Sequence, residues 1–204
     1  MLAQPFQTKF NSKATHPNST DRGRISVVII TSNEEQKIRD CLESVRWADE
    51  VIVVDAWSTD RTVEIAREYT DRIFQRKWEG YSPQKNFGLS HMREEWVLFL
   101  DADERISEAL AKEIQETLKT TKEYHGFYFP RRSFYFGRWI EYGEWNPDFQ
   151  LRLVKKGKAQ WVGRVHEKIR LDGRVGYLKY PLYHYPHRDF RHHFNKLIRF
   201  GHLF

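Results

Sequence analysis

The sequence predicts an α/β protein with a doubly wound, mostly parallel sheet, and three observations support this prediction. Short apolar runs recur along the first half of the chain, and stretches with helical spacing of apolar residues lie between them. Polar or acidic residues follow where the runs end. Alternating strands and helices form parallel sheets through right-handed crossovers, so the carboxyl ends of the strands meet at one edge. Open sheets of this kind bind their ligands at that edge.

Four apolar runs are the expected strands of this sheet. The runs at 25–30 and 51–54 are rich in β-branched residues, and the run at 72–74 is short. The run at 96–100 is apolar throughout, which is typical of a strand buried on both faces.

Four helices are expected between and after these strands. In the first helix, apolar residues recur at helical spacing, at Ile38, Cys41, Leu42 and Val45. Cys41 is therefore expected in the core. Side chains that can cap a helix mark the four starts: Ser32 in a capping box with Glu35, Thr59 or Asp60, Ser82 followed by Pro83, and Ser107.

The second half of the chain has a different pattern. Strands are expected at 126–130 and 150–154, with a turn at 155–158, and the segment 131–148 is dense in aromatic and charged residues. Residues 188–204 have one apolar stripe with basic residues elsewhere, which predicts an amphipathic basic helix.

Composition limits the class of protein. The length of 204 residues suits a single domain, here 24–204, with a polar, disordered tail at 1–23. The 34 basic and 28 acidic residues give a net charge of +6, which fits an anionic ligand or surface. The single Cys41 excludes an internal disulfide and a Cys-rich zinc site, so a reducing, cytoplasmic location is expected. No run approaches a membrane span, and no RNP or KH pattern indicates a nucleic-acid partner.

Two carboxylates follow the fourth strand and are the candidate metal ligands. On an extended chain Asp101 and Asp103 point the same way, so they can share one divalent cation, Mg²⁺ or Mn²⁺. Such a cation completes its shell with water and substrate phosphates, which predicts a metal–diphosphate site. The alternative is a solvated acidic loop after a strand. Residues 31–35 and Asp55 also lie at expected strand ends, so three polar clusters converge on one crevice.

The order of these motifs resembles that of the family 2 glycosyltransferases, which have the Rossmann-like GT-A fold. The matching segments are Thr31-Ser32-Asn33-Glu34-Glu35, Val53-Val54-Asp55 with Ser58-Thr59-Asp60-Arg61-Thr62, Gln84-Lys85-Asn86 and Asp101-Ala102-Asp103-Glu104. The resemblance is to the bacterial branch that builds lipopolysaccharide core and related surface glycans, and it covers about 25–203. It implies a nucleotide-binding part at 24–120 and an acceptor part at 121–187. Trp57 departs from the family pattern, which has glycine there.

The resemblance implies an inverting transfer of a sugar from a nucleotide-diphosphate donor to an acceptor hydroxyl. It implies that Asp103 binds the metal and that Asp101 assists it or holds the ribose. The residues expected to line the nucleotide are Thr31, Asn33, Glu35, Asp55 and Lys85. For Lys85, the expected contact is the diphosphate, and the alternative is a solvated helix lysine.

An inverting transfer also needs a general base on the acceptor side. Glu167 matches the position of the family's His-Glu pair, with His166 to orient it, and Asp148 is the rival. Aromatic side chains suit the apolar faces of a sugar acceptor, and the candidates are Tyr135, Trp139, Tyr142 and Trp145. Ordinary core packing is the alternative for these rings. The histidines from His184 onward lack the spacing of a structural metal site.

The expected partners are a nucleotide-diphosphate sugar, a glycan or lipid-linked glycan acceptor, and an anionic membrane surface for the basic C-terminal segment. The apolar pattern still runs at Phe204, so this end either touches the membrane or continues in a longer chain. Two other functions stay open: a polyprenyl-phosphate sugar synthase of the same fold, and a non-catalytic nucleotide-sugar or membrane-binding module. A nucleotidyltransferase would need a Gly-rich loop after the first strand, which 31–35 does not provide.

Overall fold

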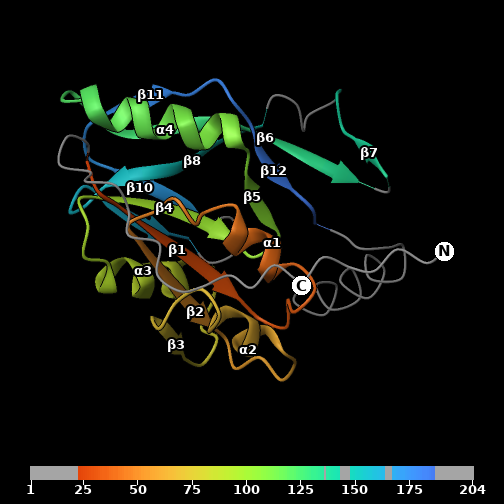
Figure 1. Ribbon diagram of the computed structural model, residues 1–204. Helices are drawn as coiled ribbons and strands as arrows, with labels where there is room; N and C mark the ends of the chain where they lie inside the picture. Colours follow the sequence, from red (N-terminus) through yellow and green to blue (C-terminus); the bar gives the residue numbers. More distant parts are fainter. Residues whose placement is uncertain (1–22, 136, 143–147, 164–166, 187–204) are drawn as a thin grey trace.

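The computed structural model describes residues 23–135, 137–142, 148–163 and 167–186. Within these residues, a ten-stranded sheet has the strand order β3-β2-β1-β4-β8-β6-β12-β5, and β7 and β11 also pair with β6 (Figure 1). Its strands are β1 (Ile25–Thr31), β2 (Glu50–Asp55), β3 (Ile73–Gln75), β4 (Trp96–Asp101), β5 (Glu104–Ile106), β6 (Tyr124–Tyr135), β7 (Arg138–Trp139), β8 (Asp148–Lys155), β11 (Arg174–Tyr177) and β12 (Leu182–His184). Strands β3, β2, β1 and β4 are parallel, as predicted.

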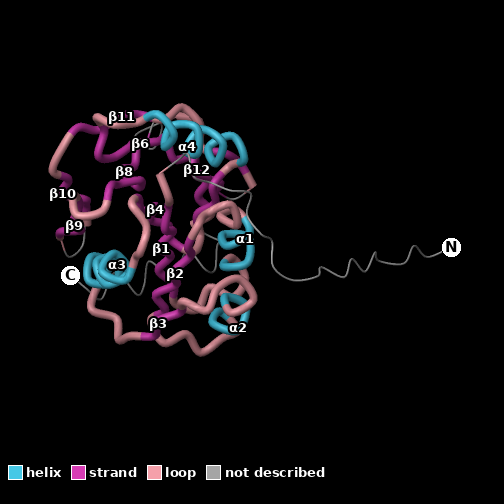
Figure 2. Tube along the Cα trace, turned by 60° about the vertical axis from the view of Figure 1, so that its left-hand side comes forward, coloured by secondary structure: helices cyan, strands magenta, loops and turns pink. Residues whose placement is uncertain are grey.

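Helices cover both faces of the parallel strands, which confirms the doubly wound architecture. The helices are α1 (Ile38–Glu43), α2 (Thr62–Ala66), α3 (Tyr81–His91) and α4 (Glu108–Thr120). Helices α1, α2 and α4 lie on one side of the strands (Figure 2). Helix α3 lies on the other side with a separate hairpin, β9 (Ala159–Val162) and β10 (Lys168–Leu171).

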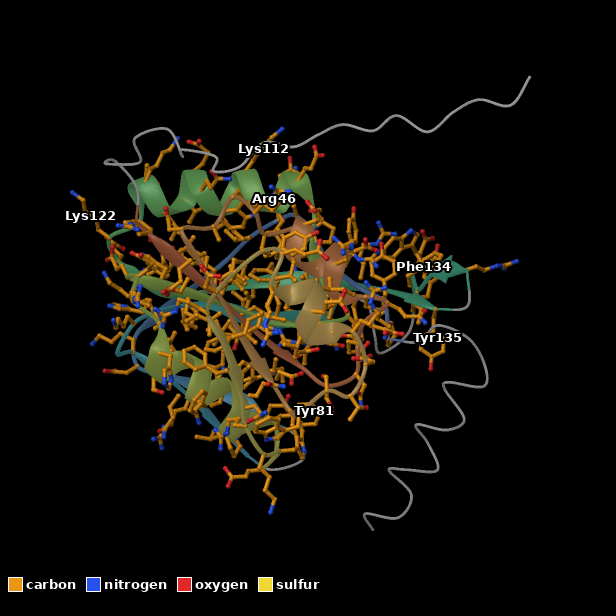
Figure 3. All side chains as sticks on the ribbon, turned by 60° about the horizontal axis from the view of Figure 1, so that its bottom comes forward. Arg46, Tyr81, Lys112, Lys122, Phe134 and Tyr135 are labelled. Carbon is orange, nitrogen blue, oxygen red and sulfur yellow. The ribbon has the colours of Figure 1, made fainter. Side chains whose placement is uncertain are left out.

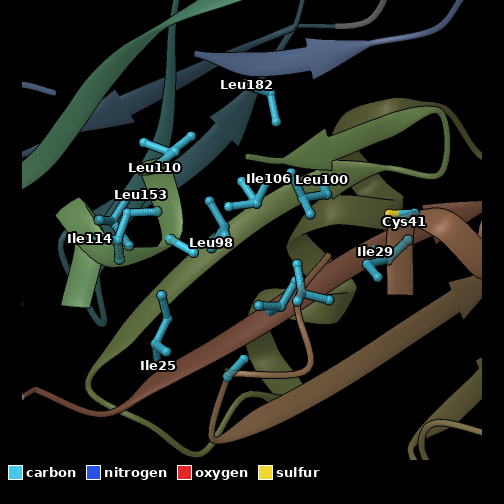
Figure 4. Packing of buried hydrophobic residues seen from close by; sticks show 14 of the residues in the cluster. Ile25, Ile29, Cys41, Leu98, Leu100, Ile106, Leu110, Ile114, Leu153 and Leu182 are labelled. Atoms are coloured by element: carbon cyan, nitrogen blue, oxygen red, sulfur yellow. The ribbon is translucent and has the colours of Figure 1, made fainter. Parts of the chain in front are cut away.

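The alternation of side chains along β1 divides the core in two. Val27 and Ile29 pack with residues of α1, α2 and α4, including the buried Cys41 (Figure 4). Val28 and Ile30 face the opposite way and pack with residues around α3 and the hairpin. A strand with apolar side chains on both faces is stable only when both are covered. This explains why the apolar runs lack a polar alternation.

Helix α3 approaches the sheet very closely. A Cβ atom added to Gly88 would lie only 2.3 Å from Cγ1 of Val28 on β1. The absence of a side chain at Gly88 therefore lets α3 pack close against the sheet. The polar side chains one turn earlier on the helix lie close to the sheet for the same reason.

The second half of the sheet is mixed rather than parallel. Strand β8 runs antiparallel to both β4 and β6. Strand β12 joins β6 to β5, and its register places His184 opposite Glu104 and Ser133. This pairing brings the far end of the chain to the segment that carries the acidic pair.

Of the four predicted helix starts, two are wrong, and at a third, α2, the residue before the helix is Arg61 while Asp60 accepts from the amide of Thr62 at 3.0 Å. Helix α1 begins at Ile38 without a side-chain cap, because Glu35 instead accepts a hydrogen bond from the backbone amide of Arg61. Helix α3 begins at Tyr81 after Gly80, and the hydroxyl of Ser82 donates to a distant carbonyl. The predicted cap Ser107 is confirmed, since its Oγ accepts from the amide of Leu110 at 3.2 Å.

Several predictions lie outside the described residues. They concern the tail at 1–22, the amphipathic segment 188–204, Trp145 and His166. None of the helices found in the described parts of the chain has the length and apolar character of a membrane span.

Candidate active site

The polar strand ends converge at one edge of the parallel strands, as the sequence predicts. Thr31 at the end of β1 lies opposite Asp55 at the end of β2. On the other side of β1, Ile30 lies opposite Asp101 at the end of β4. The three strand ends are therefore neighbours in the sheet, at the place where open α/β sheets bind ligands.

Asp101 lies between two buried cations. Its Oδ2 accepts a hydrogen bond from Nη2 of Arg152 at 3.0 Å, and its Oδ1 lies 3.1 Å from Nζ of Lys85. The side chains of Lys85 and Arg152 are 1% and 4% exposed, whereas that of Asp101 is 28% exposed. Burial alone would raise the pKa of Asp101, but the charges of Lys85 and then Arg152 outweigh it and hold the pKa well below its ordinary value. Asp101 is thus ionised, and it is the most exposed of these three side chains.

The buried carboxylate of Glu104 completes this charge cluster. Its Oε1 accepts from Arg152 at 2.8 Å, and its Oε2 accepts from the backbone amide of Asp101 at 3.0 Å. Arg131 approaches Glu104 Oε1 at 3.6 Å and also binds Asp148 with Nε and Nη2, at 2.8 and 2.7 Å. A second Asp148 oxygen accepts from Gln150. Asp148, one of the two candidate bases, is therefore held as a partner of Arg131.

The prediction that Asp101 and Asp103 lie on one extended strand is wrong. The bond from the Asp101 amide to the Glu104 carboxylate closes a turn, and β5 begins at Glu104. Asp103 lies in that turn, with Oδ2 at 3.7 Å from Nε2 of His184 and 4.0 Å from Nζ of Lys37. Burial raises the pKa of Asp103, but the neighbouring His184 outweighs this effect and holds the pKa below its ordinary value.

His184 and Arg152 are site residues that the sequence did not predict. The other ring nitrogen of His184, Nδ1, lies 3.0 Å from the hydroxyl of Ser133, which fixes the plane of the imidazole. A metal-ligating histidine is commonly oriented in this way by a second polar group. Among the described residues, no cluster of three His, Cys, Asp or Glu side chains is arranged to hold a metal ion. Asp103 and His184 thus offer two ligands, and a bound cation would need water or substrate oxygens for the rest.

Lys85 is not a solvated helix lysine. Besides Asp101, its Nζ lies 3.1 Å from Oε1 of Glu167 and 4.3 Å from the ring centre of Trp161. Tyr81 stands on the same helix, and burial and then the charges of nearby carboxylates raise its pKa to about 12. These carboxylates are, in order of their effect, Asp101, Glu167, Asp103 and Glu34. The acidic pair and the candidate base Glu167 therefore share one site.

The predicted nucleotide residues of the first two loops mainly hydrogen-bond to other residues of the protein. Asn33 has a φ of 54°, and its Oδ1 accepts from the amide of Thr59 at 2.8 Å. Asp55 is fully buried and accepts from Ser58 through its amide and hydroxyl and from Gln75 at 3.0 Å. Asn33 and Asp55 therefore fix the loop conformation. Thr31 differs, because its Oγ1 is buried without a hydrogen-bond partner in the described parts of the chain.

The loop after β2 presents an unusual tryptophan. Trp57 has a φ of 55°, a left-handed conformation that a bulky residue rarely adopts, and it is 59% exposed. Its neighbours are fixed on both sides, since the amide of Ala56 donates to Thr31 O and that of Ser58 to Asp55. The fold thus maintains a strained, exposed indole at the edge of the candidate site.

The predicted acceptor residues are divided between two environments. Trp139 packs in a cluster of four rings with Phe134, Tyr183 and Tyr185, at centroid distances of 5.1, 4.9 and 5.8 Å. Tyr142 is 86% exposed. Tyr135 is half-buried and lies with Phe134 at the end of β6, apart from Tyr81 (Figure 3).

Comparison with known proteins identifies the family. The pattern described as "Glycosyl transferase family 2" matches residues 26–201. The chain belongs to glycosyl transferase family 2. A lipopolysaccharide core biosynthesis glycosyltransferase, LpsC of Rhizobium meliloti, is 33% identical over 159 residues, which are 74% of this chain and 59% of LpsC. An uncharacterized glycosyltransferase of Rickettsia typhi is 46% identical over 93 residues, 45% of this chain and 32% of that protein.

A solved structure supports the GT-A fold of this family 2 chain. TarS 1–349 of S. aureus, in complex with UDP-GlcNAc, superposes with a TM-score of 0.60 at 18% identity. The superposition covers 81% of this chain and 59% of TarS 1–349. The chain spans about three fifths of LpsC and about a third of the Rickettsia typhi relative.

The buried charge cluster leads to a stability prediction. Replacing Arg152 by Met removes the cation that the buried Glu104 and the adjacent Asp101 bind, so we expect the free energy of unfolding to fall by about 3–5 kcal/mol. Urea denaturation followed by circular dichroism measures it. Arg174→Met, which breaks an exposed pair with Glu123, is the control and should cost less than about 1 kcal/mol. Equal losses in the two variants would contradict the role given to Arg152.

Proposed function

We propose that this chain carries the catalytic site of an inverting glycosyltransferase that uses a nucleotide-diphosphate sugar and acts in lipopolysaccharide-core or surface-glycan synthesis. One observation carries the proposal. In a family 2 chain, an ionised acidic pair and a third carboxylate, Glu167, lie together at the carboxyl edge of the parallel strands. The similarity to LpsC supports the glycan class.

The donor would lie over the ends of β1 and β2. Thr31 lies there opposite Asp55, and Asn33, Glu35 and Asp55 shape the loops around the donor. The exposed indole of Trp57 offers a flat surface on which a nucleobase can stack. The related fold of TarS was solved with UDP-GlcNAc, which supports a nucleotide sugar as the ligand class.

Asp103 would hold the divalent cation, Mg²⁺ or Mn²⁺, together with His184. Both side chains face each other at 3.7 Å, and the residues offer the oxygen and imidazole nitrogen ligands that such ions accept. The ion would neutralise the departing diphosphate. Asp101 would assist from one side, because Lys85 and Arg152 already balance its charge.

Glu167 would take the proton of the acceptor hydroxyl. The acceptor oxygen then forms a bond to the anomeric carbon while the bond to the diphosphate oxygen breaks, and the nucleoside diphosphate leaves with the electron pair. Asp148 is less suited as base because Arg131 and Gln150 occupy both of its oxygens. The rings of Tyr135, Trp139, Tyr142 and Trp145 would contact the acceptor glycan, and the segment 188–204 would contact an anionic membrane surface.

Nucleotide binding tests the proposed donor and metal sites. We expect UDP or GDP with Mn²⁺ to raise the melting temperature of the protein, because a ligand that binds only the folded state stabilises it. Asp103→Asn should remove the Mn²⁺-dependent part of this rise, while the exposed control Asp172→Asn should retain it. The absence of any shift in the unmodified protein across UDP, GDP and CDP would contradict the proposal.

Replacing Trp57 should separate stability from binding. Trp57→Gly relieves the left-handed strain, so we expect the free energy of unfolding to rise by about 1 kcal/mol. The same variant should bind the nucleotide at least tenfold more weakly, measured by calorimetry, because the stacking surface is lost. The control is Trp78→Gly, another partly exposed tryptophan, which should lower stability and leave nucleotide affinity unchanged. Unchanged nucleotide affinity in Trp57→Gly would exclude the stacking role.

Two variants distinguish the candidate bases. Glu167→Gln should bind the nucleotide normally and abolish sugar transfer to core-truncated lipopolysaccharide, because the amide cannot accept the hydroxyl proton. Asp148→Asn should retain measurable transfer. The assay is release of nucleoside diphosphate that depends on the acceptor. Normal turnover by Glu167→Gln would assign the role to Asp148, and transfer only to polyprenyl phosphate would indicate the synthase instead.

A further inference from the structure

We propose that Lys85 is a positioning residue for the transfer reaction, and that α3 clamps the β9–β10 hairpin so that Glu167 is held beside Asp101. This inference rests on the proposed function, because it takes Glu167 as the base. It assigns Lys85 a role different from the contact with the diphosphate that the family resemblance implies.

The first argument is the position of the lysine. Nζ of Lys85 lies 3.1 Å from both Oδ1 of Asp101 and Oε1 of Glu167, which come from segments 66 residues apart in the chain. The Lys85 side chain is 1% exposed, and its ammonium group also faces the ring of Trp161 at 4.3 Å. A buried ammonium group is stable only when charge and hydrogen bonds compensate its lost hydration. Both carboxylates already provide that compensation, so the lysine is committed to them.

The second argument is a set of hydrogen bonds from the same face of α3. Ser82 and Asn86 stand three residues before and one after Lys85, so all three side chains project from one side of the helix. The hydroxyl of Ser82 donates to Gly163 O at 2.7 Å. Asn86 donates to Trp161 O at 2.8 Å and accepts from the Trp161 amide at 2.9 Å. These bonds fix the hairpin backbone on the strand that precedes Glu167.

The third argument is the close seating of α3 on the sheet. Because Gly88 lets the helix approach Val28 without a side chain between them, the Lys85 side chain reaches the end of β4 from inside the protein. The clamp therefore links the strand that ends at Asp101 to the hairpin that carries Glu167. Without the cation, the two carboxylates would repel each other, and Glu167 would move away from the donor side. A displacement of about 1 Å at a reacting group can lower a rate roughly a hundredfold.

Kinetics of three variants of the full chain test this inference. The donor is whichever of UDP-glucose, UDP-GlcNAc and GDP-mannose gives the largest thermal shift with Mn²⁺, and the acceptor is core-truncated lipopolysaccharide. We expect Lys85→Met to lower kcat at least 100-fold and to change the KM for the donor less than threefold. Lys85→Arg, which keeps the charge, should recover at least a tenth of the lost rate. Lys112→Met, at an exposed position of α4, is the control and should behave as the unmodified protein.

Asn86→Ala keeps both the lysine and the carboxylates, so it tests the clamp even where Lys85→Met fails to fold. We expect a roughly tenfold lower kcat, an unchanged KM for the donor, and faster amide hydrogen exchange in 159–163. A Lys85→Met variant with kcat within threefold of normal, or an Asn86→Ala variant with normal kcat and exchange, would overturn the inference. In either case turnover by the unmodified protein would leave the proposed function standing, whereas no turnover by the unmodified protein would reject the proposed function itself.

Discussion

The structure around the candidate site depends on the ion pairs that Asp101 makes with Lys85 and Arg152. Burying either cation alone would be costly, because each loses its hydration. Each is stable in the interior because a carboxylate accepts its hydrogen bonds, and the low pKa of Asp101 keeps that carboxylate charged. The three residues come from α3, β4 and β8, so their ion pairs link helix α3 to two neighbouring strands of the sheet.

This arrangement continues in both directions as an alternation of charges. From Arg152 it passes to Glu104 and Arg131 and ends at Asp148, and from Lys85 it passes to Glu167. The two candidate bases therefore stand at opposite ends of the same chain of ion pairs. They differ in their immediate partners, because Asp148 binds a guanidinium group through two nitrogens and Glu167 faces a single ammonium group. Arg131 and Gln150 together occupy both carboxylate oxygens of Asp148, whereas Lys85 contacts one oxygen of Glu167.

The part of the crevice formed by the loops after β1 and β2 is organised more by strain and backbone hydrogen bonds than by buried charge. Two residues there, Asn33 and Trp57, have left-handed backbone conformations. For Asn33 the conformation is stabilised by a hydrogen bond, which its side chain accepts from the neighbouring loop. For Trp57, the described parts of the chain show no side-chain hydrogen bond that accounts for the conformation, and the indole is exposed at the end of β2.

The sequence by itself determined the fold class, the parallel direction of the first strands and the convergence of their ends on one crevice. These features depend on short-range patterns: apolar runs, helical spacing, and caps such as Ser107. Capping at Ser32 and Ser82 was mispredicted because the local pattern is the same whether Glu35 and Ser82 bond their own helix or a distant loop. Only the tertiary structure decided that Lys85 is buried, that Arg152 faces Asp101, and that His184 lies against Asp103. The physical reason is that each of these contacts joins residues at least 16 positions apart, and the energy of a buried charge depends on all the partners that folding brings to it.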